Sequence, residues 1–99
     1  MKKNKSNQSN GHGSLARSIQ LEFTHPSAGV VSVAGTFNDW HPGKTPMVAL
    51  GEGRWIKPLS LPPGTYEYLF VADHEWMLDP LAKQTFPNPY GGLNSVLIV

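Results

Sequence analysis

The sequence predicts an all-β protein, an antiparallel β-sandwich of about seven short strands. Apolar residues recur at every second position in several short segments, which is typical of strands with one buried face. Turn-forming Gly, Pro, Asn and Asp interrupt the chain about every ten residues. No segment has a convincing helical period: only Leu81–Gln84 could form a helical turn, and Pro87 would end it.

The strands follow from this alternation, taken in chain order. Each ends at a turn signal, such as His25-Pro26 after the first strand or Gly51–Gly53 in an expected hairpin. The expected strands are Ile19–Phe23, Val30–Ala34, Met47–Leu50, Arg54–Lys57 with a continuation to Leu61, Thr65–Asp73 and Ser95–Val99.

Two of these segments carry further information. Pro58 cannot donate to a sheet ladder, so its strand is expected at an edge or with a bulge. Thr65–Asp73 has one fully apolar face and a second face with Glu67, Leu69 and Val71 that is half apolar. After it, the stretch from Asp79 to Gly92 contains too many helix and strand breakers for regular structure to be expected.

Composition limits the chain to one small domain. Of the 99 residues, 1–18 form a polar leader that we expect to be disordered, and 19–99 form the sandwich. The net charge of +1 does not indicate nucleic acid or an anionic membrane as a partner, and no apolar run approaches the length of a membrane span. The sequence has no cysteine, which fits a cytoplasmic protein. The start at Met1 and the end at Val99 favour a free-standing small protein.

The segment Gly35–Trp40, GTFNDW, follows the second strand and turns sharply. It places Trp40 at the edge of a sheet, where the indole either stands in solvent or caps the core. A second tryptophan, Trp76, comes after the polar turn Asp73–Glu75, whereas Trp55 lies within a strand and is expected in the framework.

Four motifs together resemble the family 48 carbohydrate-binding modules, which include the glycogen-binding domain of the AMP-activated protein kinase beta subunit and the amino-terminal domains of isoamylases and branching enzymes. The resemblance covers about Ile19 to Val99. It implies an immunoglobulin-like early-set sandwich that binds α-glucans such as glycogen or starch. The motifs are GTFNDW, LPPGTYEYLFVAD, EWMLDP and NPYGGLNSVLIV.

The resemblance also implies a carbohydrate site without a cofactor or metal. The stacking tryptophans of the family fall on Trp40 and Trp76, its sugar-binding asparagine on Asn94, and the large residue that projects from its loop on Tyr90. By the residues alone, Asn94 could equally satisfy loop backbone groups.

Two positions depart from the family. A lysine that bonds sugar hydroxyls in the kinase-type members is Leu69 here, and a loop threonine is Gly92. Both positions are peripheral to the expected site. The departures lower the expected affinity, and they leave open an altered specificity or a domain that no longer binds sugar.

The chemistry of such a site follows from the sugar. A glucose ring presents C–H groups on its faces, and an indole presents a flat apolar surface with a negative face, so stacking buries apolar area. One such contact is worth on the order of 1–2 kcal/mol. Several are needed, and binding in the micromolar to millimolar range is expected.

Catalysis is not expected. His12, His25, His41 and His74 are scattered without a metal-ligand spacing. The acidic residues between Asp73 and Asp79 occupy a loop of a small sandwich, with no cleft to enclose a glycoside. The alternative functions are an accessory domain of a glycogen- or starch-active enzyme, with its tryptophans packed on that enzyme, or a protein-interaction subunit associated with a kinase.

Overall fold

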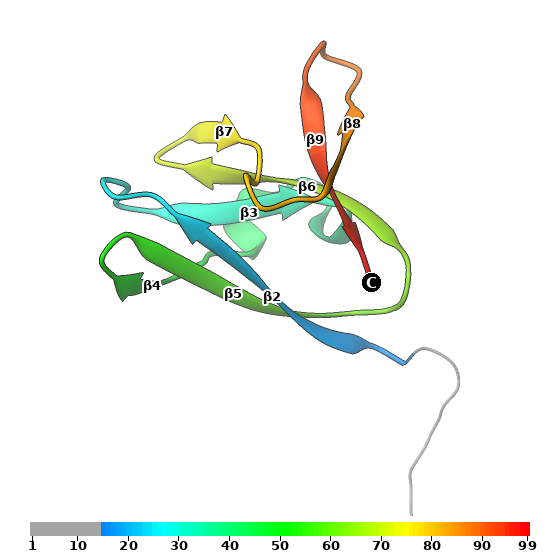
Figure 1. Ribbon diagram of the computed structural model, residues 1–99, viewed down its shortest axis with the longest axis horizontal. Helices are drawn as coiled ribbons and strands as arrows, with labels where there is room; N and C mark the ends of the chain where they lie inside the picture. Colours follow the sequence, from blue (N-terminus) through cyan, green and yellow to red (C-terminus); the bar gives the residue numbers. More distant parts are fainter. Residues whose placement is uncertain (1–14) are drawn as a thin grey trace, which may run out of the picture.

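Two antiparallel sheets face each other in the computed structural model, which describes residues 15–99 (Figure 1). The all-β sandwich expected from the sequence is confirmed, with eight strands in this part of the chain instead of about seven. Two short 3-10 helices, η2 (Thr36–Asn38) and η3 (Pro42–Lys44), follow β3. The strands are β2 (Arg17–Thr24), β3 (Val31–Gly35), β4 (Val48–Gly51), β5 (Arg54–Leu61), β6 (Thr65–Ala72), β7 (Glu75–Met77), β8 (Gln84–Pro87) and β9 (Leu93–Ile98).

The larger sheet is built around β6. Its strand order is β3-β6-β9-β8, and β7 pairs with β6 as well. Because β3 occupies one edge of β6, β7 and β9 share the other edge: β7 lies opposite Phe70–Ala72 and β9 opposite Thr65–Tyr68. Side chains of β7 and β9 therefore reach the same outer face of β6.

The smaller sheet has the order β2-β5-β4. The chain crosses between the sheets after β2, β3 and β5, so residues distant in sequence meet in the core (Figure 1). Strand β5 is central in this order, whereas the sequence suggested an edge or a bulge at Pro58; beyond Ile56, β5 is paired on one side only. Pro58 pairs with Gln20 of β2, and it is tolerated because β4 reaches only Arg54–Ile56 on the other side.

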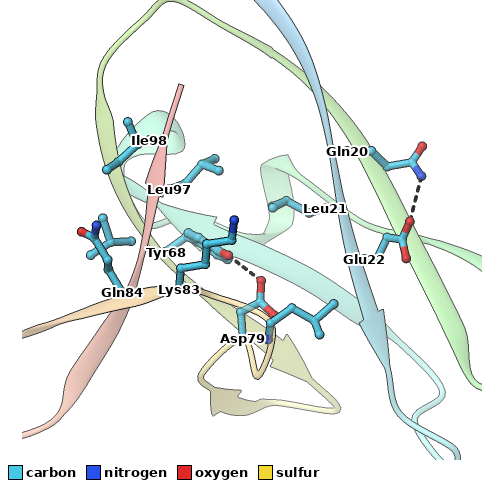
Figure 2. Close-up of a pocket in the computed structure, with 11 residues that line it drawn as sticks. Gln20, Leu21, Glu22, Tyr68, Asp79, Lys83, Gln84, Leu97 and Ile98 are labelled. Atoms are coloured by element: carbon cyan, nitrogen blue, oxygen red, sulfur yellow. Dashed lines mark hydrogen bonds between the residues drawn. The ribbon is translucent and has the colours of Figure 1, made fainter.

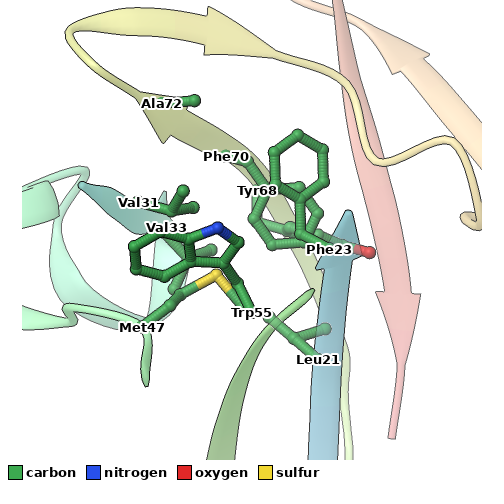
Figure 3. Close-up of a cluster of buried hydrophobic side chains, with 9 residues drawn as sticks. All are labelled: Leu21, Phe23, Val31, Val33, Met47, Trp55, Tyr68, Phe70 and Ala72. Carbon is green, nitrogen blue, oxygen red and sulfur yellow. The ribbon is translucent and has the colours of Figure 1, made fainter. Parts of the chain in front are cut away.

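The core lies between the two sheets (Figure 3). Phe70 of β6 is completely buried, and its ring centroid lies 4.4 Å from that of Phe23 on the facing sheet. Trp55 is only 9% exposed, so its expected place in the framework is confirmed. The buried cluster comprises Leu21, Phe23, Val31, Val33, Met47, Trp55, Tyr68, Phe70 and Ala72.

Three expectations need correction or restriction. Strand β2 begins at Arg17, two residues before the boundary expected at Ile19, and residues 1–14 of the predicted leader lie outside the described residues. The segment after Asp79 is not irregular throughout, because Gln84–Pro87 forms β8 against β9. No helical turn occupies 81–84, where a turn leads directly into that strand.

Within residues 15–99, no helix is both long enough and apolar enough to cross a membrane.

Candidate functional site

A cleft of about 590 Å³ opens on the outer face of the larger sheet. Its walls come from the turn after β3, from β6, from β7, from the loop between β8 and β9, and from Asn94 at the start of β9. Of the residues that the resemblance placed at a carbohydrate site, the structure brings Trp40, Trp76, Tyr90, Asn94 and Leu69 together here, whereas Gly92 does not line the cleft. The lining residues are Thr36, Trp40, Glu67, Leu69, Trp76, Asn88, Pro89, Tyr90 and Asn94.

Trp40 is held at the end of a tightly bonded turn. Gly35 is required at its start, since a Cβ atom there would lie 2.5 Å from the carbonyl oxygen of Glu67. Asn38, largely buried, accepts the Gly35 N–H at 3.0 Å and donates to the Val33 carbonyl at 3.0 Å. The Trp40 N–H then donates to the Gly35 carbonyl at 2.9 Å. These bonds fix the backbone at Trp40, whose indole is half-buried.

Trp76 stands on β7, directly opposite Val71 of β6. Side chains of directly opposed residues share a face, so the indole projects on the same side as Leu69, two residues from Val71 along β6. The hairpin turn between the strands has positive φ at both Asp73 and His74, which matches the twist of antiparallel strands. Trp76 is 48% exposed, and it lies on β7, a strand that was not among those expected from the sequence.

Asp73 ties this hairpin to the start of β3. Its carboxylate accepts the N–H groups of Gly29 and Val30 at distances of 3.0 to 3.1 Å. These backbone hydrogen bonds favour the ionised form, and they lower the pKa of Asp73 from its ordinary value of 3.8.

Tyr90 projects from the β8–β9 loop and is 93% exposed. Asn88 organises this loop, since its side-chain oxygen accepts the N–H of Tyr90 at 2.9 Å and that of Gly92 at 3.1 Å. Gly91 has φ of +88°, a conformation that favours glycine. Sequence reasoning did not single out Asn88, although an asparagine that bonds its own backbone two residues on is a known turn signal.

Asn94 is only 6% exposed, and both ends of its amide are engaged. Its nitrogen donates to Glu67 Oε1 at 3.0 Å, and its oxygen accepts from Asn88 Nδ2 at 3.3 Å. It links β6 to the loop that carries Tyr90. The sequence placed Glu67 on this face of the strand but did not indicate a role in the site. Its partner Asn94 is 27 residues away, and such a distant contact leaves no local pattern in the sequence.

A second depression, of about 530 Å³, lies between β2 and the end of β9 (Figure 2). Its aromatic residue is Tyr68, whose hydroxyl donates to Asp79 at 2.5 Å. Burial, together with the Asp79 carboxylate, raises the pKa of Tyr68. Tyr68 is buried and offers no exposed ring, so this depression has no platform for a sugar. In residues 15–99, no group of three or more His, Cys, Asp or Glu side chains could hold a metal ion.

A family model described as the glycogen recognition site of AMP-activated protein kinase matches residues 17–99 of the chain. The chain belongs to this family. The matched range includes every residue that lines the cleft, from Thr36 to Asn94.

Two known proteins are similar to this member of the glycogen-recognition family. The 5'-AMP-activated protein kinase subunit beta-1 of Sus scrofa is 29% identical over 69 residues, which are 70% of this chain and 53% of that protein. The chain thus spans about half the length of this relative. The crystal structure of a maltogenic amylase from S. marinus superposes with a TM-score of 0.71 at 25% identity, over 83% of this chain and 13% of the amylase.

Proposed function

We propose that the cleft on the larger sheet binds α-1,4-linked glucan chains of the glycogen or starch type, with sugar rings stacked on Trp40 and Trp76. The observation that carries this proposal is that two tryptophans from different elements line one open cleft, within a domain of the glycogen-recognition family. Tyr90 adds an exposed ring at the rim of the same cleft.

The geometry suits a polymer better than a small enclosed ligand. Trp76 is half exposed and Tyr90 almost wholly so, which leaves both rings accessible to a sugar chain that passes over the cleft. Each stacked ring contributes on the order of 1–2 kcal/mol. Leu69 offers the sugar apolar contact and no hydrogen bond. Hydrogen bonds to the sugar hydroxyls must therefore come from the polar side chains that line the cleft beside it. This supports binding in the micromolar to millimolar range.

We further propose that the domain has no glycosidase activity of its own. Hydrolysis of a glycosidic bond requires two carboxyl groups on opposite sides of that bond, about 5 to 9.5 Å apart. Among the residues that line the cleft, Glu67 carries the only carboxylate. The cleft therefore has the parts for recognition and lacks the acid–base pair for cleavage.

Association with a protein kinase is the second proposal, supported by the 29% identity to a kinase subunit over 69 residues. In that case the glucan site would bring the kinase to a polysaccharide particle. A cytoplasmic location, expected from the cysteine-free sequence, belongs to the same proposal.

Isothermal titration with maltoheptaose tests the proposed function. We expect saturable binding, and we expect cellohexaose, a β-1,4-linked chain of the same sugar, to bind at least tenfold more weakly because its flat ribbon shape does not match two fixed rings. Trp40→Ala and Trp76→Ala should each weaken binding about 5- to 30-fold while the thermal unfolding of the domain stays cooperative. Equal binding of the two sugars, or unchanged binding by both variants, would contradict the proposal.

A further inference from the structure

Glu67 is the one side chain lining the glucan cleft that carries a formal charge. It lies on β6, two residues before Leu69 and on the same face. Its Oε1 atom accepts the hydrogen bond from Asn94, whereas within the described residues Oε2 receives no hydrogen bond from the protein. One carboxylate oxygen therefore remains free to accept hydrogen bonds in the cleft.

The surrounding structure holds this carboxylate in place. The Glu67 N–H donates to the Thr36 hydroxyl at 3.2 Å, which fixes the backbone next to the turn that carries Trp40. Asn94 fixes the side chain and is itself bonded to Asn88, the residue that organises the Tyr90 loop. Glu67 is thus connected to the turn that carries Trp40 and to the loop that carries Tyr90. Because its side chain is already ordered, binding of a ligand costs little further conformational entropy at Glu67.

We propose that Glu67 contacts the sugar directly and determines the specificity of the cleft. Its free oxygen accepts hydrogen bonds from glucose hydroxyls, and its negative charge makes the cleft select uncharged glucan over glucan that carries phosphate esters. This inference rests on the proposed glucan binding and specifies the class of glucan.

The chemistry of the carboxylate supports both parts of the inference. An ionised carboxylate is an acceptor only, and hydrogen bonds to it are about twice as strong as neutral ones. Vicinal hydroxyls of a sugar are donors that such an oxygen can accept. A phosphate ester is an acceptor with a charge of about −2 at neutral pH. It cannot donate to Glu67, and the two negative charges repel each other in a partly desolvated cleft. The cleft lining includes no lysine or arginine that would offset this repulsion.

The test compares maltoheptaose with maltoheptaose that carries one 6-phosphate ester, by isothermal titration at low salt. For the wild-type protein we expect the uncharged sugar to bind about 5- to 20-fold more tightly. Glu67→Gln keeps an oxygen for Asn94 but removes the charge. It should weaken maltoheptaose binding about 3- to 10-fold and reduce the preference between the two sugars to less than about twofold. Glu22→Gln, which makes the same charge change on β2 of the other sheet, should alter neither quantity.

Glu67→Asp separates the two effects, since it keeps the charge but withdraws the oxygens by one methylene. We expect weaker maltoheptaose binding and a retained preference for the uncharged sugar. If wild-type and Glu67→Gln proteins bind both sugars with the same affinities, the inference is wrong while the proposed function stands. If the wild-type protein fails to bind maltoheptaose at all, the proposed function fails, and the inference fails with it.

Discussion

Asn38 donates a hydrogen bond from Nδ2 to the Thr45 hydroxyl over 2.8 Å, and both residues are buried. This bond ties the turn that carries Trp40 to the segment leading into β4. Asn38 also bonds the Gly35 N–H and the Val33 carbonyl, so one side chain satisfies three groups that would otherwise lack partners. The position of the Trp40 ring therefore depends on a residue that does not line the cleft.

We expect Asn38→Ala to destabilise the domain by about 2 kcal/mol or more, because it leaves buried polar groups without hydrogen bonds. Binding of maltoheptaose should weaken as well, since the turn no longer holds Trp40. Urea unfolding and isothermal titration measure the two effects. The neighbouring change Asp39→Asn, at a position with φ of 56° that asparagine tolerates, should leave both nearly unchanged. An Asn38→Ala protein as stable as the wild type would contradict this account.

The sequence predicted the platform of the site better than its polar network. Trp40 and Trp76 each follow a strand and a turn with strong local signals, so their positions could be read from neighbouring residues. Glu67, Asn88 and Asn94 form a network that no local pattern reveals, because its central bond joins residues 27 apart. The sequence left two roles open for Asn94, a sugar contact or hydrogen bonds to loop backbone groups, whereas its hydrogen bonds in the structure go to the side chains of Glu67 and Asn88.

In the fold, too, the sequence predicted the elements that have a local signal and missed one that depends on distant residues. Strand β6 is buried at alternate positions from Tyr68 to Ala72, and β3 is buried at Val31 and at Val33–Gly35; the sequence located both strands. Strand β8 has four exposed residues, and two of its features, Pro87 and the absence of apolar alternation, argue against a strand. It forms because its backbone pairs with β9, and such pairing leaves no trace in the apolar pattern of the sequence.

Asn88→Ala should loosen the Tyr90 loop without unfolding the domain. The loop is exposed, so we expect a small loss of stability, but maltoheptaose binding should weaken about 3- to 10-fold because ordering the loop then costs entropy on binding. Hydrogen exchange of the Tyr90 and Gly92 amides should become faster. Asn88→Asp keeps an oxygen that accepts both N–H groups but loses the Nδ2 donor to Asn94, so the Tyr90 and Gly92 amides should stay protected in this variant. Exchange rates that do not change in Asn88→Ala would show that another contact orders the loop.

Trp55 provides the contrast to the two cleft tryptophans. It is buried among residues of both sheets, so Trp55→Ala should destabilise the domain by about 3–5 kcal/mol. That loss approaches the whole stability of a small domain, and a large unfolded fraction is expected at 25 °C. Trp55→Phe should retain the fold with a smaller loss, and its maltoheptaose affinity should match that of the wild type. Thermal unfolding by circular dichroism measures the first effect. A tenfold loss of affinity in a folded Trp55→Phe protein would contradict the framework assignment.

Asp73 makes stability depend on pH. Its pKa is lower in the folded protein because Gly29 and Val30 donate N–H groups to the carboxylate. A carboxylate with a lowered folded pKa stabilises the protein above its unfolded pKa, and this contribution is lost as the pH falls below 3.8 through the folded value. We expect wild-type protein to be more stable than Asp73→Asn at pH 5, where the Asp73 carboxylate is ionised in both the folded and the unfolded state. The difference should shrink towards pH 2.

Urea midpoints across this pH range measure the difference, and the comparison with Asp73→Asn removes the contribution of the other carboxylates. A difference that stays constant down to pH 2 would show that the charge of Asp73 contributes no stability.

The central claim is that Trp40 and Trp76, and not Trp55, contact the glucan. The protein has three tryptophans, so its NMR spectrum has three indole N–H resonances that assigned variants can distinguish. Titration with maltoheptaose should shift the resonances of Trp40 and Trp76 along one saturating curve and leave that of Trp55 in place. Absence of any shift at several millimolar sugar, or shifts confined to Trp55, would contradict the account.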